Sequence, residues 1–341
     1  MIIGKRERKR RVLPLLLLAV LLAAGLAAAR LWIFWYTPSR EPGSEVMVTI
    51  PGGSSFVSAS RLLLESGVIT SLKPFVFIGK IKGLSNSIQA GELMFRTDMS
   101  PAQVMVVLTR GKPVSYQVTV PEGYDIRQIA GLLSSLGLVD GERFLKLSTD
   151  ADFSRSLGVP AGSLEGFLFP DTYHWPKGLT EEDILARMVS RYAEVLTPEM
   201  RQRMQEMGLS ELEVVTLASI IEKETGAPEE RNLVSAVFHN RLRKGYRLQT
   251  DPTVIYGLEE FDGNLTREHL RQDHPYNTYT RPGLPPGPIA NPGEASLLAA
   301  LNPAEVNYLY FVSRGDGTHV FSSTLVEHNE AVRAFQLGGG R

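Results

Sequence analysis

Two glutamates near a predicted helix end are the residues of this sequence best placed for chemistry. Residues 218–225 read ASIIEKET, an apolar run followed by Glu222, Lys223 and Glu224. A carboxylate in the last turn of a buried helix meets the negative end of the helix dipole, and burial also disfavours its charged form. Both effects raise its pKa, as a general acid working near neutral pH requires. Glu222 and Glu224 are therefore both candidates for a general acid, although the local pattern fits an ordinary exposed helix end equally well.

Other kinds of catalytic site find little support in the sequence. The absence of cysteine excludes disulfide scaffolds, zinc–thiolate and iron–sulfur sites and a thiol nucleophile. None of the six histidines is spaced as an H-x-x-x-H or H-E-x-x-H pair, and there is no P-loop or G-x-S-x-G motif. We therefore expect neither a metal nor a cofactor.

The candidate acid lies within a run of capped helices in the second half of the chain. Capping boxes that begin at Thr180 and Ser210 predict two helix starts, and the second of these helices is expected to end at Gly226. The next predicted helix starts at Pro228 and stops at Gly245. The candidate glutamates would thus lie where one helix ends and another begins.

A loop-rich segment follows these helices. Residues 248–303 are rich in Pro and Gly, interleaved with Tyr, Asn and apolar side chains. This mixture predicts an ordered, pocket-forming surface rather than a flexible linker. Residues 308–313 and 319–323 then read as a closing β-hairpin around Gly315.

The first half contains an internal repeat at a constant offset of 70 residues. VTIPGG at 48–53 matches VTVPEG at 118–123, and each copy predicts a short strand, a turn and an amphipathic helix stopped by glycine. A helix at 73–82, a strand at 90–96 and a further helix capped by Ser100 are predicted between the copies. Residues 45–150 are therefore expected to form a duplicated α+β domain, which either only packs or binds glycan.

A basic cluster and an apolar run open the chain. Residues 1–30 hold seven cations against Glu7, a charge of +6, so the remainder carries −7 within the total of −1. The apolar residues 12–29 and the aromatic group at 31–36 are long enough to cross a hydrocarbon core of about 30 Å. The preceding cations predict a cytoplasmic N-terminus. The acidic remainder argues against nucleic-acid binding.

A cleaved signal peptide is the alternative interpretation of the same segment. The apolar run exceeds the usual hydrophobic region of about 7–15 residues, and bulky aromatic residues follow it directly. We therefore expect a retained anchor at residues 12–36, a cytoplasmic tail at 1–11, and export of everything that follows.

Several long motifs connect the chain to a known family. They are EGFLFPDTY at 165–173, ASIIEKET at 218–225, RLQTDPTVIYG at 247–257, and YNTY with GLPPGPI within 276–289. Through these motifs, residues 48–335 resemble the endolytic murein transglycosylases (MltG or YceG-like proteins), single-pass membrane enzymes of bacterial peptidoglycan.

The resemblance implies an α+β fold, with an N-terminal transmembrane helix, a LysM-like domain at 45–150 and a catalytic domain at 151–337. It implies cleavage of glycan strands between N-acetylmuramic acid and N-acetylglucosamine, leaving 1,6-anhydro-muramyl ends. It identifies Glu222 as the catalytic glutamate. It also implies a location at the cell (inner) membrane and partnership with peptidoglycan synthases.

Given a glycan substrate, amide and phenol groups are expected to hydrogen-bond sugar hydroxyls, and aromatic rings to stack on sugar faces. The candidate sugar contacts are Gln249, Tyr256, Asn277 and Tyr279, with Asp251 and, more weakly, Glu165 as further pocket residues. Asp251 would otherwise cap the following helix. Glu224 is expected to pair with Arg231 or Arg241 in a structural role.

A lytic transglycosylase needs a single acidic residue, because the muramyl C6 hydroxyl replaces water as the nucleophile. Glu222 would first protonate the leaving oxygen and then accept the proton of O6. Two alternatives stay open. A muramidase-type hydrolase would use two carboxylates, Glu222 with Asp251, and a non-catalytic anchor would only bind peptidoglycan.

Overall fold

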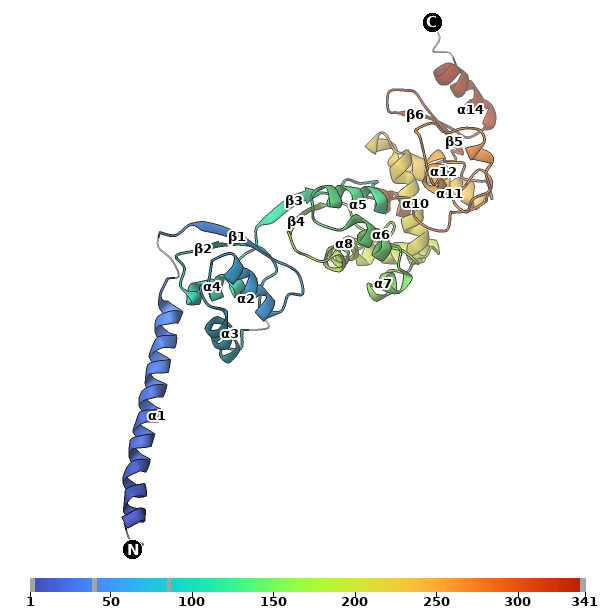
Figure 1. Cartoon of the computed structure of the whole chain (residues 1–341). Helices are drawn as coiled ribbons and strands as arrows, with labels where there is room; N and C mark the ends of the chain where they lie inside the picture. The colour runs from blue at the N-terminus through green and yellow to red at the C-terminus, as the bar shows by residue number, and fades with distance from the viewer. Residues whose placement is uncertain (1–3, 39–41, 85–86, 338–341) are drawn as a thin grey trace. The chain divides into compact units, whose positions relative to one another are not determined.

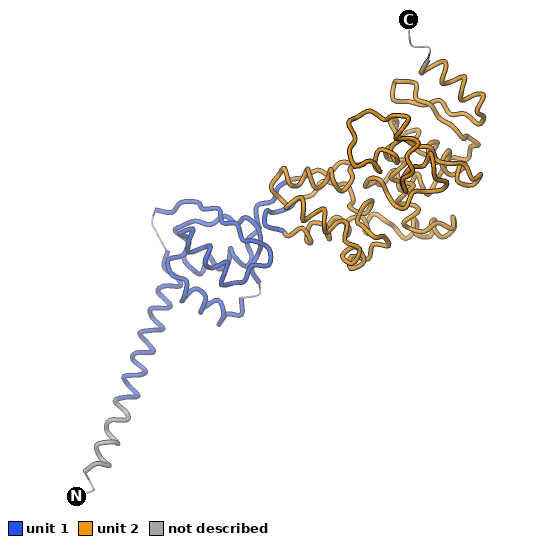
Figure 2. Tube along the Cα trace, turned by 45° about the vertical axis from the view of Figure 1, so that its right-hand side comes forward, with its two compact units in different colours: residues 1–116, 174–179 blue, residues 117–173, 180–341 orange. Residues whose placement is uncertain are grey.

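The computed structural model describes residues 4–38, 42–84 and 87–337 as helices joined to short two-stranded sheets (Figure 1). This mixed content agrees with the predicted α+β class. The contacts divide the chain into two compact units (Figure 2). Unit 1 comprises residues 1–116 and 174–179, and unit 2 comprises residues 117–173 and 180–341.

Unit 1 is a small α+β body. Its strands β1 and β2 pair antiparallel, with Val48 opposite Leu93. Apolar side chains from this pair and from the helices form one core, in which Phe56 and Phe75 stack with ring centroids 6.1 Å apart. The elements are α1 (Gly4–Tyr36), β1 (Glu45–Ile50), α2 (Phe56–Glu65), α3 (Leu72–Ile81), β2 (Gly91–Arg96) and α4 (Pro101–Arg110).

Helix α1 contains a segment that could cross a membrane. Leu16–Tyr36 is apolar over 21 residues, about 31 Å of helix at 1.5 Å per residue. Nearly all of it is exposed, but Trp35 packs against Phe75 in the core of unit 1. This helix is compatible with a single-pass anchor.

The chain passes from unit 1 to unit 2 within β3 (Ser115–Thr119) and returns within β4 (Thr172–Pro176), and these two strands pair. Unit 2 is mainly helical, and its strands β5 and β6 form an antiparallel hairpin. Its elements are α5 (Ile126–Ser135), α6 (Gly141–Ser148), α7 (Ala151–Ser156), α8 (Glu181–Val195), α9 (Pro198–Met207), α10 (Glu211–Glu224), η2 (Pro228–Glu230), α11 (Arg231–Arg243), α12 (Asp251–Gly257), η3 (His269–Arg271), α13 (Glu294–Leu301), β5 (Tyr310–Ser313), β6 (His319–Ser322), α14 (Leu325–Val332) and η4 (Arg333–Leu337).

The two copies of the predicted repeat have matching helices in the structure. Helices α2 and α5 lie 70 residues apart at both ends, and Ser55 and Asp125 cap them with side-chain hydrogen bonds. The inward positions also correspond, because every buried residue of one helix matches a buried residue of the other: Phe56, Ala59, Ser60 and Leu63 against Ile126, Ile129, Ala130 and Leu133. The LysM-like character of this repeat stays a prediction.

The two copies do not share one compact unit. The first belongs to unit 1 and the second, with α5, belongs to unit 2. Helix α5 packs on α6, and the backbone N–H of Ile126 donates to the Glu165 carboxylate. These contacts lie within unit 2, so its boundary falls near residue 117 rather than at the predicted 150.

Helix α10 forms the centre of unit 2. A capping box at Ser210 starts it as predicted, and residues 214–221 are all buried, as in a helix covered on every side. It packs against α9, α11, α12 and α13. The following Gly226 is required by packing, since a Cβ there would lie 2.8 Å from the carbonyl oxygen of Gly317. The last turn of α10 is thereby held against the β5–β6 hairpin.

Candidate active site

A polar cleft of about 500 Å³ lies at the C-terminal end of α10 in unit 2. Its lining comes from α10, α11, residues 248–251, Tyr279, the β5–β6 hairpin, α14 and η4. The lining residues are Glu224, Phe238, Arg241, Leu248, Gln249, Thr250, Asp251, Tyr279, Phe311, Val312, Ser313, His319, His328 and Gln336.

Glu224 is the last residue of α10 and presents its carboxyl group to this cleft. The side chain keeps a partly exposed edge, while the carboxyl group is enclosed and accepts a hydrogen bond from the Thr250 hydroxyl. Burial raises its pKa and the charge of Asp251 adds to this, although the Thr250 hydrogen bond, His319 and Arg241 oppose the shift. A carboxyl group of this kind can hold a proton nearer to neutral pH and deliver it to a bound ligand.

The predicted ion pair of Glu224 with Arg231 or Arg241 does not form within the described residues. Arg241 instead donates through Nε to Leu309 O at 2.6 Å and through Nη1 to Leu248 O at 2.9 Å. Its guanidinium also lies over the ring of Tyr310, 5.1 Å from the centroid. Arg241 therefore joins α11 to two walls of the cleft while its charge stays near Glu224.

Three of the predicted substrate contacts line the same cleft: Gln249, Asp251 and Tyr279. The Tyr279 hydroxyl donates to the Asp251 carboxylate at 2.6 Å. Asp251 is the first residue of α12 rather than its cap, since Thr250 occupies the capping position. Both side chains line the same cleft as Glu224, and their role as sugar contacts stays a prediction.

Gln249 has an unusual backbone conformation. Its φ of +50° makes it the one described non-glycine residue in the left-handed region, where a side chain strains the backbone. Hydrogen bonds to Thr278 hold the conformation: Gln249 N donates to Thr278 O at 3.2 Å and Thr250 N to Thr278 Oγ1 at 3.1 Å. Strain of this kind is retained where neighbouring contacts enforce it, often at functional sites.

Replacing Gln249 by Gly is expected to separate stability from activity. Glycine relieves left-handed strain of about 1–2 kcal/mol, offset by about 0.5–1 kcal/mol of unfolded-chain entropy. Any replacement also loses the 3.4 Å hydrogen bond that Gln249 Oε1 accepts from Arg241 Nη1, so the Gly variant should be more stable than a variant that keeps a Cβ. For the glycan substrate that the family resemblance implies, loss of the amide should lower cleavage about fivefold to tenfold. Thermal unfolding and a cleavage assay on each variant measure the two effects. Gln249→Ala is the control, since it loses the amide but keeps the strain; equal stability of the Gly and Ala variants would contradict this account.

Glu222 lies on a different side of the helix end and does not line this cleft. Its Oε2 accepts a hydrogen bond from the backbone N–H of Gly293, at 3.1 Å, where α13 begins. The carboxylate of Glu122 lies against the same glycine, because a Cβ on Gly293 would be 2.0 Å from Glu122 Oε1. The contacts of Glu222 thus join α10 to the start of α13.

Glu165 is buried, with 2% of its surface exposed, and lies at a junction of three segments. Its Oε2 accepts hydrogen bonds from Ile126 N at 3.2 Å and from the Tyr256 hydroxyl at 3.0 Å. Its Oε1 accepts from Asn291 Nδ2 at 3.1 Å. Burial raises the pKa of Glu165 from 4.5 to about 8, against the effect of these hydrogen bonds.

The raised pKa of Glu165 predicts a pH-dependent stability. Between its unfolded pKa and about 8, the unfolded chain releases the proton while the folded protein keeps it. Stability should therefore fall as pH rises through this window, by up to about 1.4 kcal/mol per pH unit. Thermal unfolding of wild type and Glu165→Gln from pH 5 to pH 8 checks this, since the variant lacks the titration. Parallel curves for the two proteins would refute it.

The two remaining predicted contacts, Tyr256 and Asn277, do not line the cleft. The amide nitrogen of Asn277 donates to three carbonyls of its own loop, the shortest being Gln272 O at 2.7 Å. Tyr256 donates its hydroxyl to Glu165. The donor groups of both side chains are thus engaged within the protein, while Tyr256 lines a second cavity.

Sequence reasoning did not identify Arg241, His319 or His328 as cleft residues. The sequence predicts Arg241 only as a structural partner of Glu224, and its position on α11 carries no local signal of function. A hydrogen bond of 2.8 Å joins His319 Nδ1 to Glu230 Oε2. A hairpin 95 residues after Glu224 brings His319 to the cleft, and no spacing rule predicts that contact.

Comparison with known proteins gives concordant matches. The model of the YceG-like family matches residues 48–334. The endolytic murein transglycosylase of Bacillus subtilis (strain 168) is 35% identical over 314 residues, covering 86% of this chain and 85% of that protein. The protein of the same name from Streptococcus pneumoniae (strain D39) is 28% identical over 319 residues, covering 84% of this chain and 58% of its own. A crystal structure of a yceG-like protein from Listeria monocytogenes has a TM-score of 0.58 and 34% identity, covering 84% of this chain and 98% of that one.

Proposed function

The chain belongs to the YceG-like family, and from this premise we propose that it is an endolytic lytic transglycosylase of peptidoglycan. It would cleave the bond between N-acetylmuramic acid and N-acetylglucosamine within glycan strands and leave 1,6-anhydro-muramyl ends. One observation carries the proposal: a polar cleft contains an enclosed carboxyl group of raised pKa, surrounded by hydrogen-bonding side chains.

In this reaction Glu224 acts first as an acid and then as a base. Its proton passes to the glycosidic oxygen as the bond from muramyl C1 to that oxygen breaks. The muramyl O6 then bonds to C1, and its proton returns to the Glu224 carboxylate. The enzyme is regenerated without consuming water, so one protonatable group is sufficient.

Assigning the acid to Glu224 departs from the sequence-based prediction of Glu222. Glu224 lines the cleft with three of the predicted sugar contacts, whereas Glu222 accepts the Gly293 N–H at the start of another helix. Burial raises the pKa of Glu224, which favours its protonated form. Paired variants of the two glutamates decide between them, as argued in the Discussion.

Hydrolysis is the second candidate reaction, because Asp251 supplies another carboxylate in the same cleft. Its charge is close enough to raise the pKa of Glu224. Most glycoside hydrolases use two catalytic carboxylates in one cleft. The hydrogen bond from Tyr279 occupies one Asp251 oxygen and leaves the other for a water molecule.

Mass spectrometry of the products separates these functions. Purified full-length protein is incubated with uncrosslinked glycan strands, and the new ends are analysed. Anhydro-muramyl ends, one water lighter than reducing ends, support the lytic reaction. Reducing muramic ends from the wild type would show hydrolysis instead, and intact strands with retained binding would show a non-catalytic anchor.

The location we propose follows from α1. Leu16–Tyr36 would cross the cell membrane once, with the basic tail in the cytoplasm and the residues that follow Tyr36 outside it. Protease added to cells without an outer barrier should then degrade unit 2 and leave an N-terminal epitope tag intact. The family resemblance makes peptidoglycan synthases the expected partners at this membrane.

A further inference from the structure

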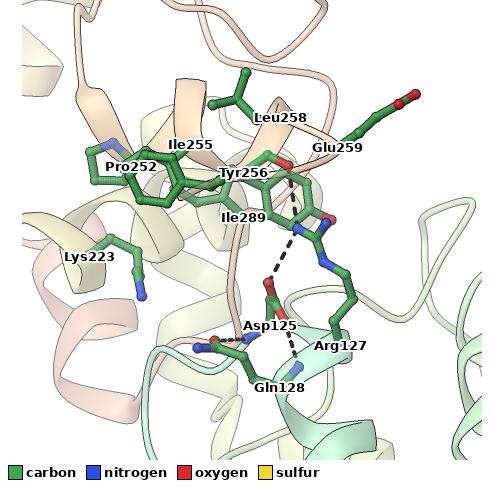
Figure 3. A pocket seen from close by; sticks show the side chains of 11 residues that line it. Asp125, Arg127, Gln128, Lys223, Pro252, Ile255, Tyr256, Leu258, Glu259 and Ile289 are labelled. Carbon is green, nitrogen blue, oxygen red and sulfur yellow. Dashed lines mark hydrogen bonds and ion pairs between the residues drawn. The ribbon is translucent and has the colours of Figure 1, made fainter. Parts of the chain in front are cut away.

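A second cavity of about 640 Å³ lies in unit 2, separate from the cleft that contains Glu224 (Figure 3). Its size is within the range of small-molecule sites. Pro252 and Ile255 of α12 line one side, and Figure 3 shows the amino end of Lys223 and the amide of Gln128 reaching toward the space from the other side. The cavity therefore combines apolar contact with polar donors.

The charges around this cavity are only partly paired. Arg127 lies 3.4 Å from the Asp125 carboxylate, so each neutralises the other. Lys223 donates to the carbonyl oxygen of Gly123 at 3.2 Å and has no carboxylate partner among the described residues. Glu259, the remaining acid of the lining, is exposed at the rim. Lys223 thus offers an uncompensated positive charge to a ligand.

Gln128 adds a second free donor beside Lys223. Its Oε1 accepts the Asp125 N–H at 3.0 Å in the capping box of α5. That bond leaves the Nε2 group without a protein acceptor within the described part of the chain. An ammonium and an amide N–H on one side of a cavity are donors suited to a carboxylate.

The donors of this cavity favour an acidic peptide over a neutral sugar. Two aromatic side chains line it, Tyr256 and Phe261. The ring of Tyr256 is already contacted by the guanidinium of Arg127 at 5.3 Å and by the Tyr276 ring at 4.9 Å, whereas Phe261 is exposed. The free apolar surface, which includes Pro252, Ile255 and Phe261, lies in the same lining as the two donors, a combination that suits a peptide carrying both carboxylates and apolar side chains.

At two places, a residue that lines the cavity is the sequence neighbour of a residue that lines the cleft. Lys223 lines the cavity and Glu224 lines the cleft; Asp251 lines the cleft and Pro252 lines the cavity. In peptidoglycan the peptide is attached to the muramic acid, next to the bond that is cut. A muramyl residue bound at Glu224 could therefore extend its peptide past the end of α10.

We propose that this second cavity binds the acidic peptide carried by muramic acid, with Lys223 and Gln128 as its carboxylate-binding side chains. The proposal rests on the function proposed above and names the part of the substrate that the cleft does not hold. It makes the protein selective for peptide-bearing strands over bare glycan.

Two measurements on the full chain test this site. The first is titration with a synthetic muramyl pentapeptide and with the same compound amidated at every carboxylate. The second is the ratio of kcat/KM on peptide-bearing strands to that on peptide-free strands. The titration needs no cleavage, so wild-type protein that binds the peptide but cuts neither strand would refute the proposed function and leave this site standing.

Four variants supply the comparison. Lys223→Met removes the positive charge of the site, and Lys223→Arg keeps it. Glu259→Gln removes the opposing negative charge at the rim. Lys244→Met is the control, because it removes a lysine that does not line the cavity. We expect Lys223→Met to weaken binding of the acidic compound about tenfold and to lower the kcat/KM ratio by a similar factor. Lys223→Arg should retain most of the affinity, and Glu259→Gln should strengthen it about twofold.

The acidic compound should bind wild type about tenfold more tightly than the amidated one, and Lys223→Met should abolish that difference. Equal binding of the two compounds by wild type would overturn the proposal. So would equal effects of the Lys223→Met and Lys244→Met substitutions. If Lys223→Met does not fold, unchanged affinity in Glu259→Gln together with equal binding of the two compounds would overturn it instead.

Discussion

Replacing Glu224 by Gln is expected to lower glycan cleavage by about 10²–10⁴-fold, because the amide can neither donate the acid proton nor accept the proton of O6. The fold should survive, since Gln keeps an oxygen that can accept the hydrogen bond from the Thr250 hydroxyl. The measurement is the rate of formation of new muramyl ends, with binding to isolated sacculi recorded for the same protein. Binding should persist while product formation is lost.

Glu222→Gln is the matched control, since it makes the same chemical change two residues earlier on the same helix. A Gln side chain can still accept the Gly293 N–H through its oxygen, so we expect activity within a few-fold of wild type. If the Glu222 variant loses activity and the Glu224 variant keeps it, the assignment made from the structure is wrong and the sequence-based one is restored. Loss in both would point to a shared structural role of this helix end.

The pH profile gives an independent check on Glu224. As a general acid it must be protonated, so kcat/KM should fall as pH rises through its raised pKa. Asp251 raises this pKa, whereas Arg241 and His319 lower it. The alkaline limb of the profile should therefore move to lower pH in Asp251→Asn. A limb that stays in place would argue against Glu224 as the titrating acid.

Replacing Arg241 by Met is expected to have the largest effect on stability, about 3–5 kcal/mol, because several carbonyl oxygens would each lose a donor at about 1–3 kcal/mol apiece. Arg241 has 9% of its surface exposed and donates to the carbonyl oxygens of Leu309, Arg247 and Leu248. Methionine fills part of the volume but leaves these carbonyls without their donor. The cleft walls on either side of α11 should loosen together, and cleavage should fall with them.

Arg241→Lys is the control for charge. Lysine keeps the cation near Glu224 but cannot present the planar fork to separate carbonyls, so we expect an intermediate loss. Tryptophan fluorescence would not report on unit 2, because Trp32, Trp35 and Trp175 all belong to unit 1. Hydrogen exchange measured on peptides of unit 2 is therefore the appropriate method. Equal protection in Met, Lys and wild-type proteins would show that Arg241 does not support the cleft.

Much of the local structure was predictable because its causes are local. The capping box at Ser210, the stop before Gly226 and the helix capped by Ser100 all appear where the sequence predicts them. These features depend on side-chain hydrogen bonds to the adjacent backbone, which neighbouring residues decide. The repeat at an offset of 70 was visible for the same reason.

The division into units was less predictable. The two copies of the repeat have the same local pattern, but Ile126 of the second copy bonds to Glu165 and Tyr124 to Asn291. These partners lie 39 and 167 residues away in the chain. Their contacts assign the second copy to unit 2, and no property of residues 118–139 alone indicates it.

The sequence by itself determined the family, the apolar N-terminal helix, the helix that carries the glutamates and the loop segment beside them. Only the tertiary structure decided which glutamate meets the cleft. Glu222 and Glu224 occupy one helical turn. Their positions are nevertheless rotated by about 200° about the helix axis, so the two side chains point to nearly opposite sides of the helix. What each one meets depends on the 248–251 loop, Gly293 and the C-terminal hairpin, segments that folding alone brings to the end of α10.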